Sequence, residues 1–215
     1  MPILHRAEQL ALDLPPINGP VQPTGWDRLQ SADAIFFAIH PPAEIRDCIS
    51  QRARELRDRH GLIGRPLNPE CLHLSLVFTG FDECVPPEAL AAIKDAASTI
   101  AMQSFRIRLD RVVSFRHQEK RPLVLRGGDD GVTGVIWLRD ALLWALARVR
   151  VPCFQTRFPR PGSQFTPHLT LLYDEGAIAG ELVEPMDWLV RDFVLVRSLH
   201  GHGQHEVLAR WKLRR

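Results

Sequence analysis

Three stretches of the chain repeat apolar residues at the spacing of a helix that buries one face. The first stretch begins after Pro41 and Pro42 and ends near Gly61, residue types that suit the start and the end of a helix. The other two cover residues 88–101 and 133–149. The pattern therefore predicts three amphipathic helices.

Short apolar and aromatic runs between these helices predict strands. They cover residues 34–39, 72–78, 105–115, 122–125, 168–173, 192–198 and 207–213, and the glycines and aspartates of 127–131 predict a turn. The resulting order, β-α-β-α-β-β-α-β-β-β, is an α+β pattern and not that of a doubly wound parallel sheet. The chain has no G-x-G-x-x-G or Walker-type loop, which argues against dinucleotide binding and P-loop chemistry.

Residues 1–31 differ from the rest of the chain because they hold five of its 17 prolines and only one weak apolar turn. We predict an extended or partly ordered leader over 1–31 and a folded domain over 32–215. A length of 215 residues with 45% hydrophobic residues provides a buried core for one domain or two small lobes. No long apolar surface stripe is evident, and we expect a monomer.

Composition excludes several classes of protein. No apolar run reaches the length of a membrane-spanning helix, and the N-terminus lacks the pattern of a secretory signal. The four cysteines form no C-x-x-C pair, so we expect no zinc ribbon and predict reduced thiols in a cytoplasmic protein. With 27 basic and 25 acidic residues the chain is not expected to coat duplex DNA. Arginine supplies 24 of the 27 cations, which suits phosphate binding but also follows from a genome-wide base bias.

One six-residue pattern occurs twice. H-L-S-L-V-F at residues 73–78 recurs 95 residues later as H-L-T-L-L-Y at 168–173, with the same residue type at each position. Because a strand alternates its faces, each copy places its histidine and hydroxyl on one face and its leucines on the other, together with Phe78 or Tyr173. One such histidine is most often structural, but two matches in a chain with nine histidines favour a function.

Two imidazoles and two hydroxyls in one cleft suit phosphodiester chemistry without a metal or cofactor. A neutral histidine takes a proton from water, and a protonated one gives a proton to the leaving oxygen. The hydroxyls stabilise the negative charge that develops on the phosphate oxygens. We therefore predict that His73, Ser75, His168 and Thr170 form one catalytic site, if the two strands face each other.

These motifs resemble the paired H-x-[S/T]-x signature of the 2H phosphoesterases, and most closely the RNA 2′,3′-cyclic phosphodiesterases, also called 2′–5′ RNA ligases. The resemblance covers residues 32–215. It includes A-I-F-F-A-I-H-P-P at 34–42, F-T-P-H-L-T-L at 165–171, P-M-D-W at 185–188 and F-V-L-V-R-S at 193–198. The sequence departs from the family in Ser75, where threonine is common, and at residues 204–207, where relatives often carry an aromatic.

The resemblance implies a two-lobed α+β fold with antiparallel sheets, a pseudo-twofold axis through a central cleft and helices on the outside. It implies hydrolysis of RNA or nucleotide ends carrying a 2′,3′-cyclic phosphate to a 2′-phosphate, with 2′–5′ ligation as a related reaction. Carried over by position, His73 donates a proton to the departing 3′ oxygen and His168 activates water, while Ser75 and Thr170 hold the phosphate. The alternative is a catalytically silent nucleotide-binding module on the same scaffold.

Other basic and aromatic residues are weaker candidates. Arg116, Arg157 and Arg160 lie in segments that also hold phenylalanines, and we predict that they contact RNA at the rim of the cleft, with Arg157 ranked first. An ordinary solvated loop is the alternative for each. The three histidines of residues 200–205 are interspersed with glycines, which predicts a hairpin turn and not a zinc site. We predict that the five tryptophans pack in the core or between lobes.

Overall fold

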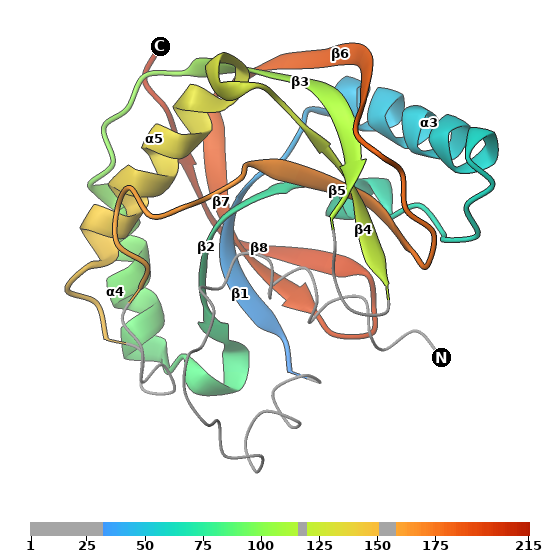
Figure 1. Ribbon diagram of the computed structural model, residues 1–215. Helices are drawn as coiled ribbons and strands as arrows, with labels where there is room; N and C mark the ends of the chain where they lie inside the picture. Colours follow the sequence, from blue (N-terminus) through green and yellow to red (C-terminus); the bar gives the residue numbers. More distant parts are fainter. Residues whose placement is uncertain (1–31, 116–119, 151–157) are drawn as a thin grey trace.

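An eight-stranded antiparallel sheet, in the order β6-β3-β4-β5-β2-β1-β7-β8, runs through the described part of the molecule (Figure 1). The structure is a computed structural model that describes residues 32–115, 120–150 and 158–215. Its strands are β1 (Ala34–Ile39), β2 (Leu74–Phe81), β3 (Phe105–Ser114), β4 (Arg121–Arg126), β5 (His168–Asp174), β6 (Glu181–Val190), β7 (Asp192–Leu199) and β8 (Gln204–Lys212). Its helices are α3 (Ala43–Arg59), α4 (Pro87–Ser98) and α5 (Asp129–Leu146), with the 3-10 turns η1 (Pro69–Cys71) and η2 (Asp82–Cys84).

Two differences from the predicted elements have physical reasons. Helix α5 begins at Asp129, inside the predicted turn. The carboxylates of Asp129 and Asp130 stabilise this helix start because they interact favourably with the positive end of the helix dipole. The hydrophobic pattern did not predict strand β6, which contains Pro185. Because β6 is an edge strand of the sheet, a residue without an N–H group is tolerated there.

The sheet consists of two matching halves. The order β2-β1-β7-β8 on one side corresponds to β5-β4-β3-β6 on the other, and each half has a strand–helix–strand segment, β1-α3-β2 or β4-α5-β5. The halves meet where Leu74 of β2 pairs with Leu169 of β5. The predicted two-lobed α+β fold is confirmed, and this one pair joins the two predicted sheets into a continuous one.

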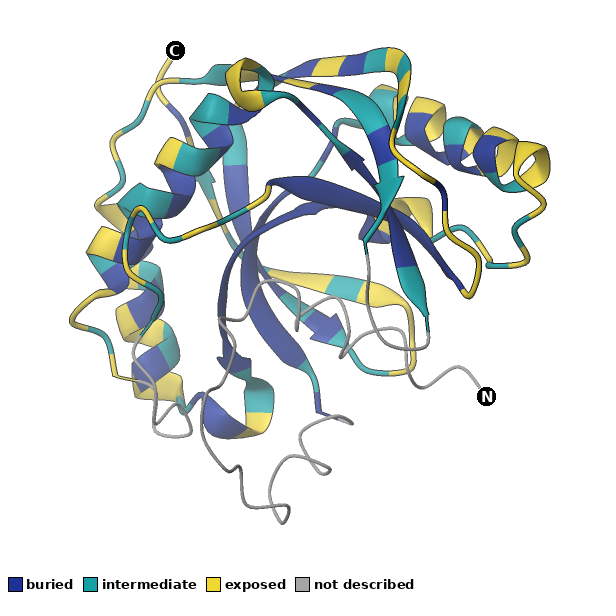
Figure 2. Ribbon diagram, viewed as in Figure 1, coloured by how far each residue is buried: buried dark blue, intermediate teal, exposed yellow. Residues whose placement is uncertain are grey.

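The helices cover one face of this sheet. Residues of α3, α4 and α5 join the large apolar cluster that contains Leu74 and Leu169. Helix α3 contacts β5 and β6 of the other half, while α5 contacts β2, so the helices also hold the halves together. On the opposite face, a smaller apolar cluster forms around Phe36 and Phe78. Strands β1, β2 and β5 are consequently buried along almost their whole length (Figure 2).

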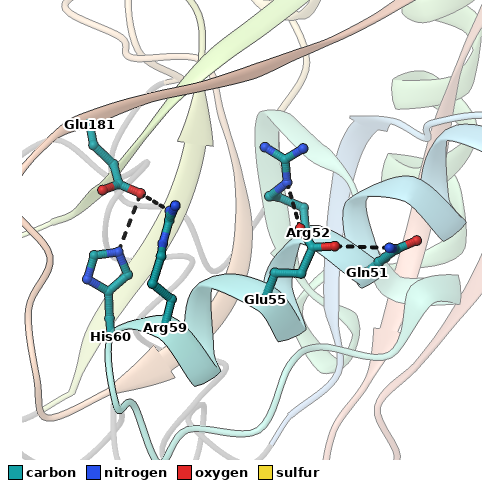
Figure 3. Close-up of polar contacts among 6 residues, drawn as sticks. All are labelled: Gln51, Arg52, Glu55, Arg59, His60 and Glu181. Carbon is teal, nitrogen blue, oxygen red and sulfur yellow. Dashed lines mark hydrogen bonds and ion pairs between the residues drawn. The ribbon is translucent and has the colours of Figure 1, made fainter.

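Polar contacts on the surface link the end of α3 to β6. Arg59 and His60 both contact the carboxylate of Glu181, and Arg52 and Gln51 contact Glu55 within the helix (Figure 3). Exposed pairs of this kind stabilise a protein by less than about 1 kcal/mol each. Apolar packing therefore holds α3 in place, and the contacts with Glu181 add a link between its C-terminal end and β6.

The cysteines and tryptophans depart in part from prediction. Cys48 and Cys71 are free, but Cys84 is disulfide-bonded, so reduced thiols are wrong for that residue. Cysteine spacing does not show which distant residues a fold brings together. Trp188 is buried, as predicted, whereas Trp137 and Trp144 are 65% and 71% exposed on α5. Cys153 and Trp26 lie outside the described residues.

The described residues contain no helix with the length and apolar composition needed to cross a bilayer.

Asp174, at the end of β5, holds the loop that follows α3. Its Oδ2 accepts hydrogen bonds from the backbone N–H of Ile63 at 2.7 Å and of Gly64 at 2.5 Å, and its Oδ1 accepts one from Gly176 at 2.7 Å. The loop approaches so closely that a Cβ on Gly64 would lie 2.1 Å from the carbonyl oxygen of Tyr173. A buried carboxylate and a missing side chain thus fix the loop against β5.

His40, directly after β1, is a partly buried imidazole whose Nε2 has no hydrogen-bond partner in the described structure. Burial, followed by the nearby charges of Arg210 and Arg46, lowers the pKa of His40 to about 4. The side chain is therefore neutral in the folded protein at pH 7, and its ring stacks on that of His205 at 6.0 Å between centroids.

We expect Asp174→Ala to lower the free energy of unfolding by about 3 kcal/mol, because three N–H groups lose a charged acceptor. Asp174→Asn should have a smaller effect, since its amide oxygen still accepts. Urea denaturation measures both, with Asp58→Ala as a control on an exposed carboxylate expected to change stability by less than about 0.5 kcal/mol. Equal effects of Asp174→Ala and Asp58→Ala would contradict this role.

Protonation of His40 should destabilise the fold in acid. Between the unfolded pKa near 6.5 and the folded pKa near 4, the unfolded chain binds a proton that the folded chain does not, so stability falls as the pH falls through this window. The contribution reaches roughly 3 kcal/mol. In urea titrations at pH 7.5 and 4.5, His40→Gln should lose less stability in acid than the wild type, while His202→Gln, at an exposed turn, should behave as the wild type does.

Candidate active site

The two repeated motifs lie side by side at the junction of the two halves. His73 directly precedes β2, and His168 is the first residue of β5. The antiparallel pair Leu74–Leu169, continued by one residue in each direction, places His73 opposite Thr170 and Ser75 opposite His168. The two histidines are then diagonal neighbours, and in a regular pair of strands the Cα atoms of such neighbours are roughly 7–8 Å apart. The structure thus brings the four predicted residues together, on the face opposite to the helices.

A β-bulge reshapes the first motif. Phe37 of β1 pairs with Val77, but the next residue of β1 pairs with Ser75, so Leu76 is an extra residue in β2. Leu76 and Val77 both enter the helix-covered core, and Phe78 lies in the cluster on the opposite face. The predicted placement of Phe78 on the leucine face is wrong, because strict alternation ends at the bulge.

The second motif carries a bulge at the equivalent position. Leu172 pairs with Leu123 of β4, while Thr170 pairs with the next residue of β4, so Leu171 is the extra residue. Leu171 and Leu172 are both in the helix-covered core. Tyr173 therefore alternates to the histidine face, and its predicted place on the leucine face is also wrong. The only sequence signal is the pair of consecutive aliphatic residues in each motif.

The His73 imidazole is held by its own strand. Its Nδ1 lies 2.7 Å from the carbonyl oxygen of Cys71, and its Nε2 lies 3.1 Å from Oγ of Ser75. Because a carbonyl only accepts, Nδ1 carries the hydrogen, and in the neutral ring Nε2 accepts from the serine hydroxyl. The side chain is 4% exposed, and its ring contacts Phe36 at 4.9 Å and the edge of His205 at 5.0 Å.

The His168 imidazole is held in the same way. Its Nδ1 lies 2.7 Å from the carbonyl oxygen of Thr166, two residues earlier, as Cys71 is to His73. The ring of Phe115 contacts His168 at 5.0 Å and 66°, the same distance and angle at which His205 contacts His73. Both rings therefore have Nδ1 bonded to a carbonyl oxygen, so only Nε2 could exchange a proton with a bound molecule.

The two hydroxyls differ in their partners. Ser75 contacts His73, whereas Thr170 Oγ1 is buried and has no hydrogen-bond partner within the described residues. A buried hydroxyl without a partner is uncommon in folded proteins. The hydroxyl of Thr170 is therefore an unused hydrogen-bond donor within the described structure.

His205 also lies at the site, although the sequence indicated only a glycine-rich turn there and a departure from the family at residues 204–207. It packs edge-on against His73 and stacks on His40, whose lowered pKa, caused mainly by burial, keeps it neutral. The turn itself is confirmed, with Gly201 and Gly203 at φ values of 73° and 57° between β7 and β8. The pairing of β8 with β7 places His205 opposite Ser198, and the ring contact shows that it reaches His73.

Of the three predicted arginines, only Arg160 lies within the described residues. Arg116 and Arg157 lie outside the described residues. Arg160 is exposed in a turn, where its carbonyl accepts a hydrogen bond from the N–H of Ser163, and its guanidinium makes no hydrogen bond or ion pair with the four site residues within the described structure. Arg126, which the sequence did not single out, instead pairs with His168 across β4 and β5.

Comparisons with known proteins agree with this architecture. The family model of the 2′-5′ RNA ligase superfamily matches residues 45–202. Escherichia coli LigT complexed with ATP is 29% identical with a TM-score of 0.66, over 86% of this chain and 99% of that one. LigT complexed with 3′-AMP is 28% identical with a TM-score of 0.62 over the same shares.

The protein TT0787 of Thermus thermophilus has the same fold, with a TM-score of 0.64 and 23% identity over 84% of this chain and 98% of that one. A search of curated proteins finds no match. The family match spans well over half of the chain. The protein therefore belongs to the 2′-5′ RNA ligase superfamily, whose activities cleave or join phosphoesters.

Proposed function

We propose that the protein hydrolyses the 2′,3′-cyclic phosphate of RNA or nucleosides to a 2′-phosphate, without a metal, using His73 and His168 as acid and base. The observation that carries this proposal is the pair of imidazoles on adjacent strands, each with Nδ1 bonded to a carbonyl. The nucleotides bound to LigT support a nucleotide substrate.

The proposed reaction is a single displacement at phosphorus. His168 Nε2 takes a proton from water, and the water oxygen forms a bond to phosphorus. The bond from phosphorus to the 3′ oxygen breaks, and protonated His73 donates the Nε2 proton to that oxygen. The product carries a 2′-phosphate, and proton exchange with solvent restores both histidines.

The two hydroxyls and the enclosure of the site support the displacement. Ser75 and Thr170 donate to the non-bridging oxygens as their negative charge increases. His73 and His168 are only 4% and 6% exposed, so their interactions with phosphate are poorly screened by water. An RNA 5′-hydroxyl in place of water would form a 2′–5′ linkage by the same steps.

We expect His73→Ala and His168→Ala each to lower kcat on adenosine 2′,3′-cyclic phosphate about 100- to 10,000-fold, because each removes a proton-transfer group. His202→Ala, on the exposed turn, is the matched control and should keep wild-type activity. Urea denaturation should show that all three variants fold. The wild-type rate should depend on pH as a bell and persist in EDTA.

Phosphorus NMR of the product tests the assigned leaving group. A 2′-phosphate is expected, and a 3′-phosphate would show that the other oxygen departs. Binding of a mononucleotide with no turnover of any cyclic phosphate would instead favour the alternative, a silent nucleotide-binding module.

A further inference from the structure

We infer that Arg126 binds the reacting phosphate from the strand beside His168. This inference rests on the proposed function and adds a residue to it. Arg126 is the last residue of β4 and pairs directly with His168 of β5. Directly paired residues of antiparallel strands lie on the same face, with Cβ atoms about 5 Å apart. The arginine side chain therefore rises next to the imidazole.

The guanidinium of Arg126 has no partner among the described residues. It makes no hydrogen bond or ion pair in the described structure, and its Nε is buried without an acceptor. Most other partly buried arginines of the described chain have a carboxylate partner, among them Arg46, Arg52, Arg111, Arg139 and Arg197. Burying a charged donor without an acceptor is unfavourable, so an anion is the missing partner. The Nε–H and Nη–H groups form a fork that matches two phosphate oxygens.

A second unpartnered donor lies on the same side of the site. Thr170 follows His168 by two residues on β5, shares its face, and has a buried Oγ1 without a hydrogen-bond partner in the described chain. Thr170 pairs with Val124, two residues before Arg126 on β4. Thr170 therefore lies next to His168 along β5, and Arg126 lies next to it across the strand pair. One phosphate beside the imidazole can accept from both.

The charges around Arg126 also favour an anion. Arg111 of β3 is its direct neighbour on the other side, and like charges opposite each other on a sheet repel. Arg111 is compensated by Asp110, with 3.1 Å between Nε and Oδ1, but Arg126 has no such carboxylate within the described residues. A bound phosphate would compensate it.

The equivalent position in the other half is neutral. The pair Ile39–Leu74, continued by one residue, places His40 opposite His73, as Arg126 is opposite His168. His40 is neutral at pH 7 because burial lowers its pKa. The two halves therefore share a scaffold but differ in charge, and Arg126 places a permanent cation on the side of the proposed base.

The test measures phosphate binding and turnover separately. Arg126→Ala should bind adenosine 2′-monophosphate about 10- to 100-fold more weakly by calorimetry, the range expected for one charged hydrogen-bonding group. Its kcat/KM on adenosine 2′,3′-cyclic phosphate should fall at least as much, whereas binding of adenosine itself should not change. Arg106→Ala is the matched control, since Arg106 lies exposed on β3 and pairs with Asp187.

If Arg126→Ala does not fold, two variants that keep a long side chain at this position still test the role of Arg126. Arg126→Lys keeps the charge without the fork and should retain part of the binding, whereas Arg126→Gln should lose it. Wild-type binding of adenosine 2′-monophosphate in the folded variants would overturn the role of Arg126 while the proposed hydrolysis stands. Weaker binding in the variants, with no turnover of any cyclic phosphate by the wild type, would support the phosphate site and refute the proposed function.

Discussion

The pairing of Leu74 with Leu169 joins the two halves of the sheet, and the arrangement of the site depends on it. Both leucines are fully buried under the helices, and both motifs extend from this pair. A shift of either strand by one residue would turn its leucines to the opposite face and its histidine into the helix-covered core. The apolar core therefore fixes the register, and the register brings the two imidazoles to one face.

Strands β2 and β5 are buried on both faces, yet each carries a histidine motif. In each strand a bulge adds an apolar residue on the helix-covered side while the polar residues of the motif stay on the other face. Leu76 and Leu171 each add one residue, so the leucines continue into Val77 and Leu172 on the helix-covered side. A bulge bends a strand and re-aims the side chains that follow it. Each half thus repeats the same local geometry, including a carbonyl on Nδ1 of the histidine and a second ring in T-shaped contact with it.

The halves diverge in the residues that surround this shared geometry. His73 is flanked by His205 and the neutral His40, while His168 is flanked by Phe115 and the cation of Arg126. Two similar imidazoles can take different roles only if their surroundings differ. The charge asymmetry between the halves suits the proposed division into an acid and a base.

The sequence by itself determined the three helices, most of the strands and the repeated histidine motif, because these follow from periodicity within a few residues. It also indicated the family, from motifs that keep their order along the chain. Four features were decided only by the tertiary structure: the edge position of the strand with Pro185, the face of Phe78 and Tyr173, the contact of His205 with His73, and the position of Arg126 beside His168. The physical reason is that bulges and cross-strand neighbours depend on which distant segments pair and in which register, and local hydrophobic patterns do not encode that choice.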